Sequence, residues 1–340
     1  IKIFKSDGYK LPDEVEEEIE AIILDEAATP PVKLGKDVGR ITVCEKTVHD
    51  YIEHLERTVD WDFSGMNIAL DCANGSASLI ARKLFEALGC ECFVRGADPD
   101  GKNINLDCGS THVEELQKFV VENNCEAGFA FDGDADRLIA VDENGNVVDG
   151  DKIIALCALD MKDTGRLKND TAVVTVMSNM GFFKFAEEKG IHCEKTKVGD
   201  RYVLENMLEN GYSIGGEQSG HVIFLDYATT GDGELTAIQI LRAMKRTGKT
   251  LSELSSVMDV YPQVLKNVKV SAFGKARFDD DDEIKNAIRK AEDELGDTGR
   301  VLVRVSGTEP LVRVMLEGKD TEQIERLADE ISEVVRERLI

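Results

Sequence analysis

The sequence lacks the features of a membrane protein or a nucleic-acid-binding protein. No apolar run approaches the length that crosses a bilayer, and no signal-peptide pattern opens the chain. Basic residues are outnumbered by acidic ones: the chain has 41 Lys and Arg and 66 Asp and Glu, so its formal net charge is −25. Nucleic acids and anionic membranes are bound by clustered basic residues, so we expect neither as a partner.

Cysteine pairs of the C-x-x-C type are also missing. The chain has eight Cys, and no His lies at ligand spacing from a Cys pair, which argues against a zinc site. Cys90 and Cys92 lie two apart on a predicted strand, so their side chains point to opposite faces. We therefore predict reduced, buried thiols in a cytoplasmic protein.

The composition is that of a globular protein with more than one domain. The chain has 340 residues, of which 42% are hydrophobic and 31% charged, and this length exceeds one ordinary core. It opens at Ile1 without Met, and its predicted first elements, a strand at 1–4 and an acidic helix from Asp13, cannot bury a core of their own. We interpret residues 1–39 as the remnant of a first domain and a linker, and expect the chain to be a fragment.

The middle of the chain alternates apolar strands with helical patterns, twice. The predicted strands are 67–71, 90–95, 127–131, 172–177 and 192–197, and helices are predicted at 78–88, 113–123 and 181–189. This pattern predicts tandem mixed α/β domains at 40–147 and 148–257, with mostly parallel sheets and ligands at the carboxyl ends of strands. The pattern changes after Pro262, and residues 258–340 are predicted to form a small α+β domain.

The motif D-G-D-A-D-R directly follows an apolar strand. It places Asp132, Asp134 and Asp136 at alternate positions, and such a cluster is costly unless a hard divalent cation binds it through oxygen. Mg²⁺ fits best, because it keeps open positions for a phosphate oxygen. A calcium helix–loop–helix site is an alternative, but its sixth position needs Gly where this chain has Arg137. A solvated acidic turn is the other alternative.

Two further loops carry polar groups. In G-E-Q-S-G-H at 216–221, two glycines bracket the Glu217 carboxylate and the Ser219 hydroxyl, which suit hydrogen bonding to sugar hydroxyls. Alone, this motif also fits a plain turn with a structural His221. In K-V-G-D-R-Y at 197–202, Asp200 could cap a helix that begins at Tyr202, or Arg201 could face a reacting phosphate.

The motif R-V-S-G-T-E-P-L-V-R at 304–313 has the composition of a phosphate cradle. Backbone amides and the hydroxyls of Ser306 and Thr308 flank Gly307 in a predicted turn, and Arg304 and Arg313 lie on the strands at either side. The alternative is a polar hairpin with surface arginines.

In their order along the chain, D-G-D-A-D-R, V-G-D-R, G-E-Q-S-G-H and R-V-S-G-T-E-P, the four motifs resemble those of the α-D-phosphohexomutase superfamily. T-T-G-D-G at 229–233 and the glutamine of G-E-Q-S-G-H are similar to its phosphoglucosamine mutase branch. The resemblance runs over the whole chain. It implies a four-domain fold, in which residues 36–340 are similar to the second, third and fourth domains.

The resemblance implies an isomerase of amino sugar metabolism that converts glucosamine 6-phosphate to glucosamine 1-phosphate, through a phosphoserine and a 1,6-bisphosphate intermediate. The roles that it implies are Mg²⁺ on Asp132, Asp134 and Asp136; the transferred phosphoryl group on Arg137 and Arg201; the sugar on Glu217 and Ser219; the non-reacting phosphate on Arg304, Ser306, Gly307, Thr308 and Arg313; and acid–base catalysis by Lys2 and His221.

One departure from the family pattern concerns the nucleophile. In the family, a phosphorylated serine in an S-H-N-P loop precedes the lysine that corresponds to Lys2, and these 340 residues contain no such loop. Ser6 lacks that context, so we expect no turnover from this chain alone. The alternatives are a phosphomannomutase or phosphoglucomutase, or a non-catalytic fragment that binds metal and phosphosugar. The oligomeric state stays open, with a homodimer among the options.

Overall fold

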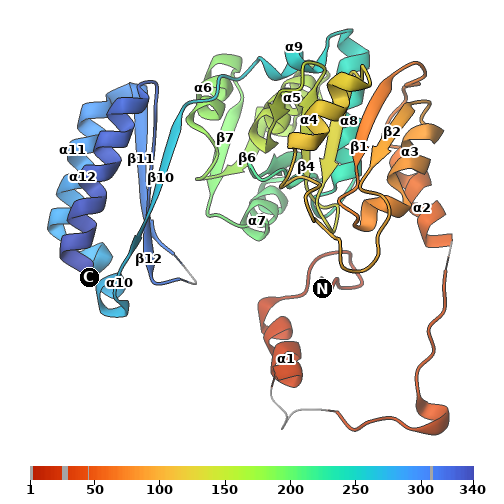
Figure 1. Ribbon diagram of the computed structural model, residues 1–340, viewed down its shortest axis with the longest axis horizontal. Helices are drawn as coiled ribbons and strands as arrows, with labels where there is room; N and C mark the ends of the chain where they lie inside the picture. The colour runs from red at the N-terminus through yellow and green to blue at the C-terminus, as the bar shows by residue number, and fades with distance from the viewer. Residues whose placement is uncertain (1–2, 25–29, 45, 307–308) are drawn as a thin grey trace. The chain divides into compact units, whose positions relative to one another are not determined.

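The computed structural model describes residues 3–24, 30–44, 46–306 and 309–340 (Figure 1). The chain divides into two compact units. The first consists of Ile1–Val176 and Glu194–Ser255, and the second of Met177–Cys193 and Ser256–Ile340.

The first unit contains a five-stranded sheet. Across the sheet, its strands are β2 (Glu91–Arg95), β1 (Asn67–Asp71), β3 (Ala127–Phe131), β4 (Leu138–Asp142) and β5 (Val147–Val148). β1 pairs in parallel with β2 and β3, whereas β3–β4 and β4–β5 are antiparallel. The expectation of a mostly parallel sheet is therefore wrong for this edge, and the D-G-D-A-D-R motif lies in the β3–β4 hairpin.

The same part of the chain contains the helices α2 (Lys46–Glu56), α3 (Ala81–Ala87) and α4 (Glu114–Glu122). Leu116 and Val120 of α4 are fully buried in one cluster with Ala69, Ala130 and Val141 of the strands. The strands expected at 67–71 and 127–131 are confirmed residue for residue, because each is a short apolar run between polar or turn-forming residues.

A second sheet has the strand order β7-β6-β8-β9. Its strands are β6 (Thr171–Thr175), β7 (His192–Thr196), β8 (Ile214–Gly216) and β9 (Val222–Phe224). β6 and β8 are parallel, and β8 and β9 form an antiparallel hairpin that carries the G-E-Q-S-G-H motif. The first unit also contains α5 (Gly150–Asp163), α7 (Asp200–Asn210), α8 (Gly233–Thr247) and α9 (Leu251–Ser255).

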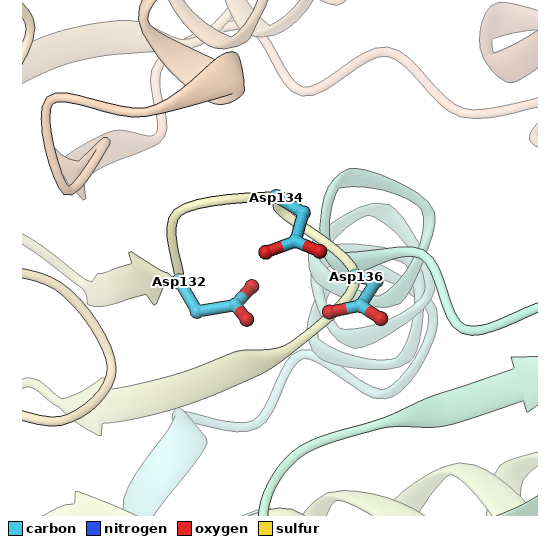
Figure 2. Close-up of side chains that lie close together, drawn as sticks. All are labelled: Asp132, Asp134 and Asp136. Atoms are coloured by element: carbon cyan, nitrogen blue, oxygen red, sulfur yellow. The ribbon is translucent and has the colours of Figure 1, made fainter. Parts of the chain in front are cut away.

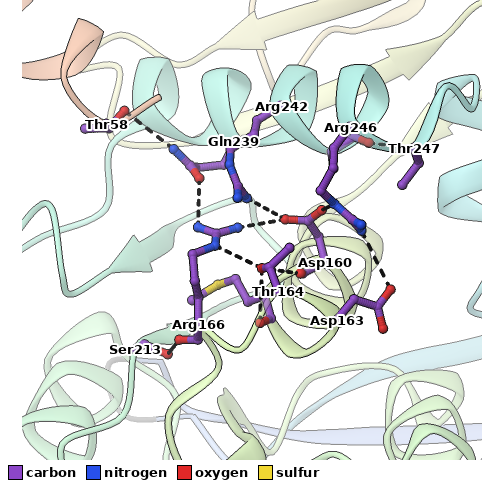
Figure 3. Close-up of polar contacts among 12 residues, drawn as sticks. Thr58, Asp160, Asp163, Thr164, Arg166, Ser213, Gln239, Arg242, Arg246 and Thr247 are labelled. Carbon is purple, nitrogen blue, oxygen red and sulfur yellow. Dashed lines mark hydrogen bonds and ion pairs between the residues drawn. The ribbon is translucent and has the colours of Figure 1, made fainter. Parts of the chain in front are cut away.

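A network of charges joins α5 to α8 (Figure 3). Asp160 of α5 is 5% exposed, and its carboxylate accepts hydrogen bonds from Arg166 (2.7 Å), Arg242 (2.6 Å) and Arg246 (2.5 Å). Gln239 of α8 accepts a bond from Arg166 at 3.4 Å. One buried carboxylate is thus the common acceptor for three guanidinium groups, and it fixes the packing of the two helices.

The N-terminal segment differs in part from expectation. The acidic helix is confirmed as α1 (Asp13–Leu24), but the predicted strand at 1–4 reduces, in its described part, to a single bridge between Phe4 and Lys10. Lys10 forms an ion pair with Asp200 at the start of α7. In the ranges that the structure describes, no helix is long and apolar enough to cross a membrane.

The second unit is built on an antiparallel sheet. Across the sheet, its strands are β10 (Gln263–Lys269), β12 (Leu311–Gly318) and β11 (Gly299–Val305). Its helices are α6 (Met180–Lys189), α10 (Ala272–Arg277), α11 (Asp282–Leu295) and α12 (Thr321–Leu339). Val312, Val314 and Leu316 of β12 are fully buried in the core, together with Ile324 of α12. The predicted α+β character of the C-terminal region is therefore confirmed.

The helix α6 belongs to the second unit although it follows β6 in the sequence. Glu317 of β12 is fully buried, and its carboxylate accepts bonds from the Met180 backbone amide (2.8 Å) and from Arg300 Nε (2.7 Å). Burial raises the pKa of Glu317, and its bonds to Arg300 and Met180 offset part of that effect. A carboxylate at a helix N-terminus is favourable, so this contact attaches α6 to the C-terminal sheet.

Candidate active site

The carboxylates of Asp132, Asp134 and Asp136 converge inside the β3–β4 loop (Figure 2). Each offers one oxygen, and these atoms lie within 4.8 Å of one another. The loop turns sharply because Ala135 adopts a left-handed conformation (φ 60°) and its amide donates to the Asp132 carbonyl at 3.1 Å. The Arg137 amide donates to the Asp132 carboxylate at 3.1 Å, while the Arg137 side chain is exposed.

This set of donors fits a hard divalent cation. All three ligands are carboxylates, which Mg²⁺ prefers, and three like charges at this spacing repel one another unless a cation lies between them. A cavity of about 500 Å³ opens beside the loop, and Asp134 and Asp136 line it together with Tyr51. The site therefore has carboxylate ligands for a cation and open space beside them.

Two glycine-bearing segments support the metal loop from either side. The Ser76 amide donates to the Gly133 carbonyl at 3.0 Å, and the Gly233 amide donates to the Ala135 carbonyl at 2.9 Å. A Cβ at Gly233 would lie 2.9 Å from the carbonyl oxygens of Ala135 and Arg137. Glycine is thus required there by close packing.

The G-E-Q-S-G-H hairpin lies against the metal loop. The Leu138 amide, at the end of that loop, donates to the Gly220 carbonyl at 3.0 Å. One oxygen of Glu217 accepts a bond from the Gly199 amide at 3.0 Å, and Ser219 is exposed. The hairpin thus contacts both the metal loop and the V-G-D-R segment.

Asp200 does not cap a helix that begins at Tyr202. The helix α7 begins at Asp200 itself, after Gly199 with φ 129°, so the capping interpretation is wrong. Burial alone would raise the pKa of Asp200, but hydrogen bonding to Lys10 and the nearby His221 hold it below its usual value. Arg201 is exposed, and its Nε donates to Glu205 at 2.7 Å.

His221 lies where three of the four motifs meet. It is 2% exposed, its Nδ1 is 3.3 Å from the Asp136 carboxylate, and its Nε2 is 3.6 Å from that of Asp200. The Gly231 amide donates to Nε2 at 3.1 Å. The first unit therefore brings together the metal loop, the V-G-D-R segment and the G-E-Q-S-G-H hairpin around one buried imidazole.

The fourth motif is in the second unit, where Arg304 and Arg313 lie directly opposite each other on β11 and β12. Burial and the neighbouring Arg313 lower the pKa of Arg304. Arg313 donates to Glu309 at 3.2 Å, yet its buried Nε has no hydrogen-bond partner among the described residues. The Ser306 hydroxyl accepts from the Glu309 amide at 3.3 Å. Two adjacent guanidinium groups with a spare buried donor suit an anion.

Three of the predicted site residues, Lys2, Gly307 and Thr308, lie outside the described residues.

The sequence patterns did not indicate the buried polar group around Asp232. Its carboxylate accepts from Tyr51 Oη and from the Leu235 amide, both at 2.8 Å, and so caps α8. Burial raises the pKa of Asp232, and burial together with Asp232 raises that of Glu234 well above its usual value. An acidic residue just before an amphipathic run is a recognised helix-start signal, so this cap could have been found from the sequence.

Family models of phosphoglucomutase/phosphomannomutase match nearly all of the chain beyond residue 48. The α/β/α domain II model matches residues 49–145, the α/β/α domain III model 149–261, and the C-terminal domain model 265–334. The chain belongs to the phosphoglucomutase/phosphomannomutase family. The resemblance to the phosphohexomutases is thereby confirmed.

Curated relatives match the chain from end to end. A phosphoglucosamine mutase of Thermoanaerobacter sp. (strain X514) is 55% identical over 339 residues, which are 100% of this chain and 76% of that protein. A phosphoglucosamine mutase of Acetivibrio thermocellus is 53% identical with the same coverage. The chain thus spans about three quarters of the length of these relatives.

Solved structures support the fold. A phosphoglucomutase/phosphomannomutase family protein of Burkholderia thailandensis has a TM-score of 0.73 at 24% identity, covering 86% of this chain and 64% of that one. The Aspergillus fumigatus N-acetylphosphoglucosamine mutase, in complex with GlcNAc-6P and magnesium, has a TM-score of 0.72 at 20% identity, covering 86% and 66%. At these identities the likeness concerns the fold alone.

Proposed function

We propose that the chain is part of a phosphoglucosamine mutase, an intramolecular phosphotransferase that interconverts glucosamine 6-phosphate and glucosamine 1-phosphate. The observation that carries the proposal is the junction of the metal loop, the V-G-D-R segment and the sugar-loop hairpin at His221. Relatives named phosphoglucosamine mutase, 51–55% identical over essentially the whole chain, support this substrate.

In this proposal, Asp132, Asp134 and Asp136 hold Mg²⁺. When bound, the cation would offset negative charge on the transferring phosphoryl group, a contribution worth several kcal/mol. Only the backbone amide of Arg137 is used within the loop, and its side chain is exposed, so its guanidinium can turn to the phosphoryl group. Arg201 would exchange its pairing with Glu205 for the same purpose.

The remaining groups bind and orient the sugar phosphate. Glu217 accepts one backbone bond and keeps its second oxygen for a sugar hydroxyl, and exposed Ser219 offers a donor beside it. Arg304 and Arg313, with Ser306, would hold the non-reacting phosphate, and Gly307 and Thr308 complete that loop in sequence. Lys2 is the proposed acid–base group.

The family mechanism also needs a phosphoserine and a 1,6-bisphosphate intermediate. The bisphosphate turns around in the site and returns its other phosphate to the serine, so the groups above must accept the sugar in two orientations. Eight free thiols in the structure accord with the cytoplasmic location that belongs to this proposal.

The proposed activity is tested by turnover. We expect a protein extended upstream through a serine loop to convert glucosamine 6-phosphate at least about tenfold more efficiently than glucose or mannose 6-phosphate, equivalent to ~1.4 kcal/mol. We expect the 340-residue chain alone to show no turnover, because it lacks the S-H-N-P loop. Coupled assays measure the catalytic efficiency on each of the three sugar phosphates and so test both expectations. A preference for mannose or glucose would instead indicate a sister mutase, and turnover by the short chain would refute the serine assignment.

The phosphate cradle can be tested in the 340-residue chain. Arg304→Ala and Arg313→Ala should each weaken binding of glucosamine 6-phosphate by roughly 1.5–3 kcal/mol, because each removes a charge-assisted contact to the phosphate. Calorimetric titration gives the dissociation constants, and Arg289→Ala, on the exposed face of α11, is the matched control. Unchanged affinity in both cradle variants contradicts the assignment.

A further inference from the structure

The two ring nitrogens of His221 have different partners. Nε2 faces the backbone amide of Gly231 at 3.1 Å, and Nδ1 faces the carboxylate of Asp136 at 3.3 Å. A backbone amide can only donate, so this contact requires an accepting lone pair on Nε2, whose other neighbour is the Asp200 carboxylate at 3.6 Å. In the tautomer that satisfies the Gly231 contact, the ring N–H lies on Nδ1 and faces Asp136.

The position of the ring is imposed by the T-T-G-D-G segment. A Cβ on Gly231 would lie 2.6 Å from both Cε1 and Nε2 of the imidazole, so only glycine lets the backbone approach this closely. Two residues later, the Gly233 amide holds the Ala135 carbonyl at 2.9 Å. The segment between β9 and α8 thus contacts the metal loop twice, once directly and once through His221.

We infer that His221 is a positioning residue for the metal ligand Asp136, and that the T-T-G-D-G segment holds His221 in the tautomer and place this requires. The inference rests on the proposed function only in that the three carboxylates bind a divalent cation. It gives His221 a part other than the acid–base role expected from the family resemblance.

The physical effect is preorganisation of one ligand. At 3.3 Å, an Nδ1–H group would bond to Oδ2 of Asp136, fix the carboxylate rotamer and leave the other oxygen available to a cation. Carboxylate ligands are normally held by such outer hydrogen bonds, and loss of one typically costs about 10–100-fold in metal affinity. The ring is 2% exposed, so water cannot readily replace it.

Two isosteric variants separate the two bonds of the ring. Asparagine places an amide N–H near the position of Nδ1, and glutamine places a carbonyl oxygen near the position of Nε2. We expect His221→Asn to keep Mn²⁺ affinity within about threefold of wild type. We expect His221→Gln to keep the Gly231 contact but to lose at least about tenfold in Mn²⁺ affinity. Mn²⁺ binding is followed by electron paramagnetic resonance of the free ion, with Mg²⁺ measured by competition.

A second, independent variant is Gly231→Ala, whose methyl group must displace the imidazole. It should lower Mn²⁺ affinity by about tenfold in the wild-type background and by much less on His221→Asn, since the smaller side chain leaves room. His49→Asn serves as the matched control, because His49 is exposed on α2 and pairs with Glu53. Circular dichroism and the fluorescence of Trp61 verify that each variant is folded.

The outcomes are distinct. If wild type binds Mn²⁺ and only asparagine preserves the affinity, His221 positions Asp136. If His221→Gln preserves the Mn²⁺ affinity and His221→Asn does not, His221 only anchors the T-T-G-D-G segment. If both variants change the affinity equally, His221 is a general packing residue. Either result overturns the inference. If wild type itself binds neither Mn²⁺ nor Mg²⁺, the metal site of the proposed function fails instead.

Discussion

Asp134→Asn is expected to lower the turnover of the serine-containing enzyme by at least about a hundredfold, or ~2.7 kcal/mol. The variant removes one of three anionic ligands whose oxygens lie within 4.8 Å of one another, while the neutral amide keeps the shape of the side chain. Sugar binding should change little, since Glu217 and the arginine cradle are untouched. Initial rates and phosphosugar titrations measure the two effects separately.

Asp134→Asn should also change how strongly Mg²⁺ stabilises the protein against unfolding. Without a cation, three neighbouring carboxylates repel one another, so replacing Asp134 should leave the metal-free protein equally stable or slightly more stable. Mg²⁺ stabilises wild type by mass action, and this increment should largely vanish in the variant. Thermal unfolding with and without Mg²⁺ measures both quantities, and exposed Asp60→Asn is the control. A variant with normal rates and a normal Mg²⁺ increment shows that this loop is not the catalytic metal site.

The elements best predicted from the sequence are those whose burial is uniform. β1 and β3 are buried on both faces and read as continuous apolar runs, so their bounds were predicted without error. β8 was missed because Ile214 is followed by two glycines, which usually indicate a loop. Here the glycines are needed, since a Cβ on Gly215 would lie 2.7 Å from Met207 Sδ and one on Gly216 would collide with the His221 carbonyl.

The residues of the site were easier to predict from the sequence than the contacts between its segments. The spacing of Asp132, Asp134 and Asp136 correctly predicted that they converge, because a single tight turn is a local property of the sequence. The contact of Asp136 with His221 joins two different hairpins, and no periodicity encodes such a distant pairing. Asp200 shows the same limit: its local context indicated a helix cap, whereas its actual partners Lys10 and His221 come from other elements.

The charge network of Asp160 illustrates how a site that carries no motif can dominate stability. Its carboxylate is the shared acceptor of three partly buried arginines, one from the segment that follows α5 and two from successive turns of α8. Removing one partner of a buried ion pair leaves uncompensated charge behind, and typically costs about 3–5 kcal/mol. In an Asp160 variant without the charge, three arginine cations would face a neutral group.

Asp160→Asn is therefore expected to destabilise the first unit by about 3–5 kcal/mol. Trp61 is the chain's one tryptophan and lies in that unit, so its fluorescence during urea denaturation follows the relevant transition. Asp163→Asn is the matched control, because Asp163 is 56% exposed, lies 3.7 Å from Arg246, and should contribute no more than about 1 kcal/mol. Adding Arg246→Met to Asp160→Asn should restore part of the loss, by about 1–2 kcal/mol, since it removes one of the repelling cations. If Asp160→Asn and Asp163→Asn unfold at the same urea concentration as wild type, the network contributes packing geometry but no net stability.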